Sequence, residues 1–308
     1  MVTSERDILW ITGPWETLDQ DGDSTVLMMR HHAASGHTNY WADAATLEVI
    51  DHSLVAKVDR IVSAVGLAPT GKAALHCVSD FGVVVYREDP PFTLRYLQRV
   101  QMLAVSSLVT GTRVVNPTQV LMTCTSKLLP ALTARNGDQT VVSDRPETLA
   151  LFAESAGAFI VKPVNGGDAQ GNLRLQRPTL EELRRLVARV GGLVVAQEVV
   201  ETPTEVRVWL HNGEPIAVAS PQSDGRDWCT ASLSEAQVKL VEGVSAILRA
   251  TATMMAALDF VGDVLVDVNV NSPGRMGELS KACGVDIPGL VCRDLEALCR
   301  ASRRSGER

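Results

Sequence analysis

LDFVGDVLVDVNVNSPGRM, residues 258–276, places three aspartates and two asparagines in a valine-rich stretch that is typical of a buried strand. Because successive side chains of a strand point to opposite faces, one face would be apolar and belong in a core. That face carries Val264, Val266, Val268 and Val270. The opposite face carries Asp263, Leu265, Asp267 and Asn269. Pro273-Gly274 cannot continue a strand, so the polar face leads into a loop.

Two interpretations of this polar face are open. The carboxylate of Asp267 and the carboxamide of Asn269 offer oxygen ligands to a hard cation. An Asp-x-Asn sequence is also typical of a strand that ends in an Asx-turn without any ligand. The stretch alone favours neither interpretation, so the choice depends on the rest of the chain.

Composition excludes several classes of protein. A chain of 308 residues with 45% hydrophobic and 21% charged residues is expected to fold into about two globular domains. The net charge of −7 argues against a general nucleic-acid binder. The six cysteines show no C-x-x-C spacing, which predicts free thiols of a reducing cytoplasm and no zinc site. Residues 1–13 do not resemble a secretory signal, and no apolar run reaches the ~18 residues that span a membrane. A cytoplasmic protein with no membrane partner is therefore expected.

Residues 1–117 alternate between apolar runs and helical spacing, which predicts an α/β unit with a mostly parallel sheet. The predicted strands are residues 7–13, 81–89 and 112–117, and the predicted helices are residues 24–37 and 93–107. A second unit follows. Its predicted helices are residues 118–134, 179–192, 234–258 and 295–308, and its predicted strands are residues 193–200, 205–220 and 263–271. Residues 157–175 are predicted to form a hairpin with a glycine-rich connection.

Four elements that suit a nucleotide occur in order along this second unit. Lys127 begins a helix, Lys162 precedes a glycine-rich loop, Gln197–Val200 lie on an apolar strand, and the aspartate–asparagine set comes last. Ammonium groups and loop N–H groups suit a polyphosphate, and carboxylates with an amide oxygen suit Mg²⁺. Each element alone is also explained by a surface lysine or an ordinary hairpin. Neither G-x-x-x-x-G-K-[ST] nor G-x-G-x-x-G is present, so the ordered combination carries the prediction.

This combination resembles the ATP-grasp superfamily, and within it the bacterial glutathione synthetases. YREDPPF is similar to the family's Arg-x-Asp-Pro-Pro-Phe, FIVKPVNGG to its Lys-Pro-Leu-Asp-Gly strand, and residues 258–274 to its metal-binding Asp…Glu-x-Asn-x-x-Ser-Pro. The resemblance implies an α/β (α+β) ATP-grasp fold. A pre-ATP-grasp domain would span residues 1–117 and an ATP-grasp domain residues 118–308, with a lid over about 118–195 and a C-terminal subdomain over about 196–308.

The resemblance also implies roles by position, with ATP and two Mg²⁺ ions as cofactors. Nucleotide binding falls to Lys127, Lys162, Gly166, Gly167, Gln197, Glu198, Val199, Val200 and Glu205. The metal ligands are Asp259, Asp267 and Asn269. Arg207 would face the reacting phosphoryl group. Arg226 is not assigned by the resemblance: it is the only obvious anion binder in residues 220–235, which depart from the family pattern. The other substrate is assigned to Arg87, Asp89, Asn271, Ser272 and Arg275. His31, His32 and Cys124 are interpreted as structural.

Several departures from the family pattern argue against glutathione synthesis itself. Asp267 stands where the family has Glu, and Asp168 and Ala169 stand where loop glycines are expected. The family's Arg-Gly-Asn-Leu-Ala-Ala-Gly-Gly substrate loop is replaced by SPQSDGRDWCTASLSE, residues 220–235.

The expected function is an ATP-dependent ligase. It would activate the carboxylate of an amino-acid-like or small-peptide substrate as an acyl phosphate and join it to an amine. The alternatives are an intramolecular cyclo-ligase that closes a cycloserine-type ring, and a non-catalytic nucleotide-binding regulator. Partners are expected to be small molecules and further copies of the chain, and not nucleic acid.

Overall fold

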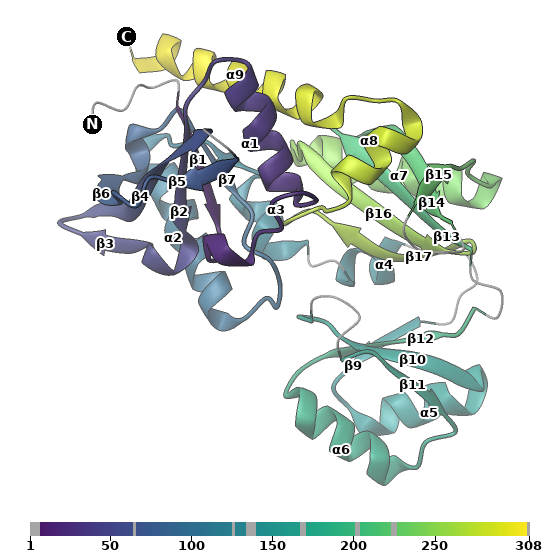
Figure 1. Ribbon diagram of the computed structural model, residues 1–308. Helices are drawn as coiled ribbons and strands as arrows, with labels where there is room; N and C mark the ends of the chain where they lie inside the picture. Colours follow the sequence, from purple (N-terminus) through teal and green to yellow (C-terminus); the bar gives the residue numbers. More distant parts are fainter. Residues whose placement is uncertain are drawn as a thin grey trace.

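The computed structural model describes residues 7–63, 66–124, 127–133, 140–166, 171–200, 204–222 and 227–306, which form three sheets covered by helices (Figure 1). The first sheet has the order β3-β4-β2-β1-β7-β8, with β5 and β6 also paired to β4. Its strands are β1 Ile8–Thr12, β2 Asn39–Asp43, β3 Glu48–Ile50, β4 Ser53–Ser63, β5 Leu67–Pro69, β6 Ala74–Cys77, β7 Val83–Tyr86 and β8 Val114–Val115.

This sheet is mixed, which corrects the prediction of a mostly parallel one. Strand β1 runs parallel to β2 and β7, and β7 runs parallel to β8. Strand β4 runs antiparallel to β2, β3, β5 and β6. Residues 39–77 supply this antiparallel half, for which no strands were predicted from the sequence.

Alternation along β1 separates two cores. Ile8 and Trp10 pack with α1 (Ser24–Ala34) and α9 (Ile287–Gly306) on one face, and Leu9 and Ile11 pack with α2 (Leu94–Thr110) on the other. Helix α1 begins where the Asp23 carboxylate accepts hydrogen bonds from two backbone N–H groups, and α2 begins at the Thr93 hydroxyl. One-turn 3₁₀ helices lie at Trp15–Thr17, Ala44–Thr46 and Val78–Asp80.

The second sheet is antiparallel, with the order β11-β10-β12-β9, and it lies at the bottom of Figure 1. Its elements are β9 Thr140–Ser143, β10 Ala158–Pro163, β11 Leu173–Gln176, β12 Val194–Glu198, α5 Pro146–Ala156 and α6 Leu180–Val190. Strands β10 and β11 form the predicted hairpin, and Thr179 with Glu182 forms the capping box of α6. Helices α5 and α6 bury their apolar sides against the sheet around Leu149, Phe159 and Leu183.

The third sheet is antiparallel, with the order β15-β14-β13-β16-β17. Its strands are β13 Glu205–His211, β14 Glu214–Pro221, β15 Trp228–Thr230, β16 Met255–Val261 and β17 Val264–Asn269. Helix α7 (Glu235–Ala250) covers one face, and α8 (Met276–Cys283) and α9 cover the other. Two predicted helices were too long: the helix expected over 234–258 ends at Ala250, because residues 255–258 belong to β16, and the one expected over 118–134 is divided into α3 (Thr118–Thr123) and α4 (Leu128–Thr133).

The opening stretch is two strands, β16 and β17, joined by a turn at Gly262 and Asp263. Asp259 pairs with Asp267 and Phe260 with Leu265, so Val266 is the extra residue of a β-bulge. The predicted faces are therefore wrong before the bulge. Leu265 is fully buried in the apolar core together with Val268, whereas Val264 and Val266 are half-buried and are not part of that core. The bulge lets Leu265 point to the core while Asp267 and Asn269 point to the other side of the strand.

Within the described part of the chain, no helix combines the length and the apolar character that crossing a membrane requires.

Candidate active site

Three neighbouring strands carry a linked set of polar side chains. Asp259 on β16 lies opposite Arg207 on β13 and opposite Asp267 on β17. The guanidinium of Arg207 donates two hydrogen bonds to the Asp259 carboxylate, at 2.7 Å from Nε to Oδ1 and 2.9 Å from Nη2 to Oδ2. The Asn269 amide nitrogen donates to Asp259 Oδ2 at 2.8 Å. The predicted metal ligands and Arg207 are thus brought together in one layer.

Two buried lysines face these carboxylates. Lys127 lies just before α4, with Nζ at 3.8 Å from Asp267 Oδ1, and donates to the Gly166 carbonyl oxygen at 2.8 Å. Lys162 on β10 donates to Gln197 Oε1 at 3.4 Å. Burial lowers the pKa of Lys162, and Lys127 lowers it further, while Asp267 and Asp259 oppose the shift. Two buried ammonium groups whose charges interact favour the binding of an anionic ligand.

A polar cleft of about 470 Å³ opens beside this set. Of the predicted residues, it is lined by Asp89, Lys127, Arg207, Asp259, Asp267, Asn269, Asn271, Ser272 and Arg275. The sequence did not predict Pro90, Phe92, Asn172 and Gly274, which also line it. Asn172 follows Gly171 at the end of the glycine-rich loop, a place that could have drawn attention to it. The Asn271 amide nitrogen donates to the Tyr96 hydroxyl and to the Leu121 carbonyl oxygen, so residues of α2 and α3 fix the orientation of this side chain.

A second, smaller pocket of about 240 Å³ adjoins the cleft and shares Asp89, Ser272, Gly274 and Arg275 with it. Arg87 lines this pocket and is 3% exposed. Its guanidinium donates to Thr25 Oγ1 and to the Pro273 carbonyl oxygen, both at 3.0 Å, and among the described residues no acceptor lies within reach of Nη1. Burial lowers the pKa of Arg87, whereas Asp23 and Asp89 raise it. This pocket is therefore lined by a buried guanidinium group whose Nη1 has no hydrogen-bond acceptor among the described residues.

Other predicted site residues lie away from the cleft lining. Gln197 is buried, bound to Lys162, and donates to Thr140 Oγ1 at 3.5 Å. Glu198 ends β12 and Glu205 begins β13, both exposed, and Val199 and Val200 are half-buried between them. This segment joins the second sheet to the third. Gly166 contributes its carbonyl oxygen to Lys127, whereas Gly167, Asp168, Ala169 and Arg226 lie outside the described residues.

The chain matches two family models. Residues 7–121 match the N-terminal domain of prokaryotic glutathione synthetase, and residues 126–284 match its ATP-grasp domain. The glutathione synthetase of Shewanella oneidensis is 23% identical over 306 residues, covering 93% of this chain and 96% of that protein. That of Pseudomonas syringae pv. tomato is 28% identical over 248 residues, covering 73% and 76%.

Solved structures share the fold. The D-cycloserine synthetase DcsG has a TM-score of 0.64 at 19% identity, with 95% of this chain and 99% of that chain covered. The ATP-grasp ligase PsnB, complexed with a phosphomimetic variant of its minimal precursor, Mg and ADP, has a TM-score of 0.62 at 17% identity, with 97% and 100% covered.

The fold and the matches make the protein an ATP-grasp ligase, an enzyme that joins a carboxylate to an amine. It belongs to the prokaryotic glutathione synthetase family. The predicted fold and enzyme class are confirmed.

The donor set fits the Mg²⁺ that such ligases bind. Two carboxylates and a carboxamide on adjacent strands, Asp259, Asp267 and Asn269, are the oxygen ligands that Mg²⁺ prefers. Lys127 and Lys162 lie close to the same carboxylates, so they would offer positive charge to phosphate groups bound beside the ion.

Proposed function

We propose that the protein uses ATP to join the carboxylate of an amino-acid-like or small-peptide substrate to an amine. The observation that carries this proposal is that Lys127, Arg207 and three oxygen donors line one polar cleft, while the buried Lys162 lies close enough to interact with the charges of Asp267 and Asp259. Such a cleft binds a polyphosphate and neutralises the charge that develops during phosphoryl transfer.

The proposed reaction has two chemical steps. A substrate carboxylate oxygen attacks the γ-phosphorus, the bond to the ADP oxygen breaks, and an acyl phosphate forms. The amine nitrogen then attacks the acyl carbon, phosphate leaves, and the amine loses a proton.

Lys127 and Lys162 hold the phosphates and Arg207 faces the transferring group. Asp259, Asp267 and Asn269 would hold Mg²⁺, which would supply Lewis-acid charge neutralisation. The chain contributes position and charge, and no covalent nucleophile is required.

The smaller pocket supports an amino-acid-sized second substrate. Arg87 and Arg275 offer cationic groups, and Asp89 and Glu278 offer carboxylates on the same walls. A zwitterion matches this alternation, because its carboxylate would satisfy Arg87 Nη1 and its ammonium group would meet a carboxylate. Ser272 lines both the smaller pocket and the cleft, and Asn271 lines the cleft.

Nucleotide recognition beyond the phosphates is assigned by the family pattern. Gln197–Val200 would receive adenine where the second sheet joins the third, and Glu205 would bind ribose. Gly166 and Gly167 would cover the phosphates, and Arg226 would bind an anionic substrate group. Two Mg²⁺ ions and a homo-oligomer are further proposals, which metal analysis of the ATP complex and analytical ultracentrifugation would test.

Ring closure within one substrate is the second candidate. A D-cycloserine synthetase is among the structures that share this fold, and the 240 Å³ pocket lies next to the cleft, since four residues line both. One molecule could therefore present both reacting groups. The non-catalytic alternative is disfavoured, because both lysines and all three proposed metal ligands are in place.

An ADP-release screen tests the proposal. The purified protein is supplied with ATP, Mg²⁺ and single amino acids, dipeptides, or pairs of carboxylate and amine, and products are identified by mass spectrometry. ADP formed with one compound alone, together with loss of water from it, indicates ring closure, and ADP formed only with a pair indicates ligation. Measurable ATP binding without ADP from any combination would refute catalysis on this substrate class.

Arg87→Lys gives a sharper test of the smaller pocket. Lysine keeps the charge but cannot span Thr25, Pro273 and a ligand at once, so the KM for the amino-acid substrate should rise about tenfold or more. The KM for ATP should stay unchanged, because Arg87 does not line the larger cleft. An equal rise in both KM values would show a general disturbance of the site.

A further inference from the structure

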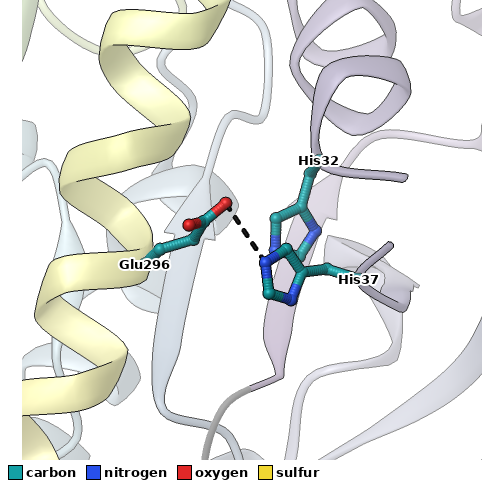
Figure 2. Close-up of side chains that lie close together, drawn as sticks. All are labelled: His32, His37 and Glu296. Atoms are coloured by element: carbon teal, nitrogen blue, oxygen red, sulfur yellow. Dashed lines mark ion pairs between the residues drawn. The ribbon is translucent and has the colours of Figure 1, made fainter. Parts of the chain in front are cut away.

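A cluster of two histidines and a glutamate lies on the side of the first sheet that α1 and α9 cover (Figure 2). His32 lies in the last turn of α1, His37 lies in the loop before β2, and Glu296 lies on α9. One nitrogen or oxygen atom from each residue lies within 4.8 Å of the others. None of the three residues lines the catalytic cleft or the pocket beside it.

The hydrogen bonds of Asn39 determine which nitrogen of His32 carries the proton. Asn39 Oδ1 accepts from the indole N–H of Trp10 at 2.9 Å, and its Nδ2 donates to the Met29 carbonyl oxygen at 2.8 Å. The amide is therefore oriented with its oxygen toward His32 Nδ1, which lies 2.9 Å away and must be the donor. The lone pair of His32 consequently lies on Nε2.

That lone pair is buried without a partner. His32 is 1% exposed, and among the described residues no hydrogen-bond partner reaches Nε2. Burial lowers the pKa of His32, with a smaller lowering by His37, while the bond to Asn39 and the charges of Glu296 and Asp7 oppose the shift. With its proton on Nδ1, the ring offers the lone pair of Nε2, which is the group that binds a metal. A buried acceptor left unpaired costs free energy, and a metal ion would remove that cost.

The other two groups are suited to complete a site. His37 stacks on His32 with ring centroids 4.7 Å apart, and its Nε2 lies 3.4 Å from Glu296 Oε1 (Figure 2). The second Glu296 oxygen lies 3.7 Å from Arg300 Nη1. Cys292, one turn earlier on α9, donates its thiol to the Met28 carbonyl oxygen and is not a member of the cluster.

We propose that His32, His37 and Glu296 bind a divalent transition-metal ion of the Zn²⁺ class, which ties α9 to the end of α1. The hydrogen bond from His32 Nδ1 to Asn39 is the outer contact that orients a histidine ligand at such sites. Tetrahedral zinc places its ligand atoms about 3.3 Å apart, so the three atoms draw together by about 1.5 Å at most. Because the two imidazole rings are stacked, their nitrogen atoms do not point at one common metal position in this structure. His37 turns about its side-chain bonds, which its 39% exposed side chain and its loop position permit. Water takes the fourth position.

Zinc and cobalt titrations of the full chain test this site. Every protein carries Cys229→Ser, because Cys229 is an exposed thiol, and the buffer holds millimolar Mg²⁺ to occupy the catalytic carboxylates. The parent protein should bind one Zn²⁺ per chain by calorimetry, and Co²⁺ should give the visible absorption of a tetrahedral site. His37→Ala and Glu296→Gln should each weaken Zn²⁺ binding by about tenfold or more.

His31→Ala is the matched control. His31 lies on the same helix, partly exposed and 3.9 Å from Asp286, outside the cluster, so its removal should leave the affinity unchanged. Thermal melts in EDTA show whether each variant folds. His37→Gln, which keeps a polar side chain of similar size, replaces His37→Ala if the latter fails to fold. Equal Zn²⁺ affinity in the parent, cluster variants and His31→Ala, or no tetrahedral Co²⁺ absorption in the parent, would overturn the proposal.

Discussion

Asn116→Ala is expected to be the most destabilising polar substitution near the active site. Asn116 follows β8 in the first sheet and is 1% exposed. Its Nδ2 donates to the carbonyl oxygens of Met255 at 2.8 Å and Val270 at 2.6 Å. Its Oδ1 accepts from the backbone N–H groups of Met254 and Met255, both at 3.0 Å. One side chain thus joins the first sheet to the strands that carry the proposed metal ligands.

The magnitude follows from these four hydrogen bonds. At about 0.5–1.5 kcal/mol each, their loss lowers the free energy of unfolding by about 2–6 kcal/mol, and burial favours the upper half, because alanine leaves backbone groups unpaired. Asn116→Asp keeps both acceptor contacts but turns a carboxylate toward two carbonyl oxygens, so it should be no milder. Gln119→Ala, an exposed position on the neighbouring α3, should stay within about 0.5 kcal/mol of the parent.

Urea unfolding followed by both tryptophan fluorescence and circular dichroism measures the effect, and coincidence of the two curves shows whether one transition is being compared. The kcat for ADP formation should also fall, since Val270 directly follows Asn269. A loss below about 1 kcal/mol for Asn116→Ala would refute the accounting of buried hydrogen bonds.

Asp267→Asn should lower Mg²⁺-dependent ADP formation by about 100-fold or more with the fold intact, whereas Asp263→Ala, which removes only an acceptor for a serine hydroxyl, should change it less than about twofold. Equal activity of both would contradict the metal assignment. Because the pKa of Lys162 is lowered, its charge is present below that pKa and lost as pH rises through it. The kcat/KM for ATP should therefore decline at a lower pH than an ordinary lysine would cause, and Lys162→Met should abolish that limb of the profile. Gly213→Ala, at φ +76° with its added methyl 2.5 Å from Arg249 Cγ, should cost about 1–3 kcal/mol of stability in a thermal melt, and no change would argue against a strained hairpin turn.

Local signals predicted the elements whose structure depends on residues that are close together in the sequence. The capping box at Thr179 and Glu182 and the hairpin around Gly171 need no information from elsewhere in the chain. The same holds for the order of lysines, hinge strand and carboxylates. Of the elements in that order, Lys127 and the carboxylates line the cleft, whereas Lys162 and Gln197–Val200 do not line it.

What the sequence could not predict depends on partners distant in the chain. The bulge at Val266 arises from pairing with β16, so strict alternation assigned Leu265 to the wrong face. The antiparallel strands after β2 exist because β4 bridges four neighbours. The pairing of Arg207 with Asp259 and the spare nitrogen of Arg87 likewise appear only once the sheets are assembled.

The hydrogen bond from Lys127 to the Gly166 carbonyl oxygen has a consequence for nucleotide binding. A buried ammonium group has few donors to share, and a phosphate oxygen is a stronger acceptor than a neutral carbonyl. We expect an arriving nucleotide to compete with Gly166 for Lys127. Nucleotide binding would then exchange one acceptor of Lys127 for another. The loss of the contact with Gly166 offsets part of the favourable free energy of the contact with phosphate. The same exchange releases Gly166, the first residue of the glycine-rich segment, from Lys127.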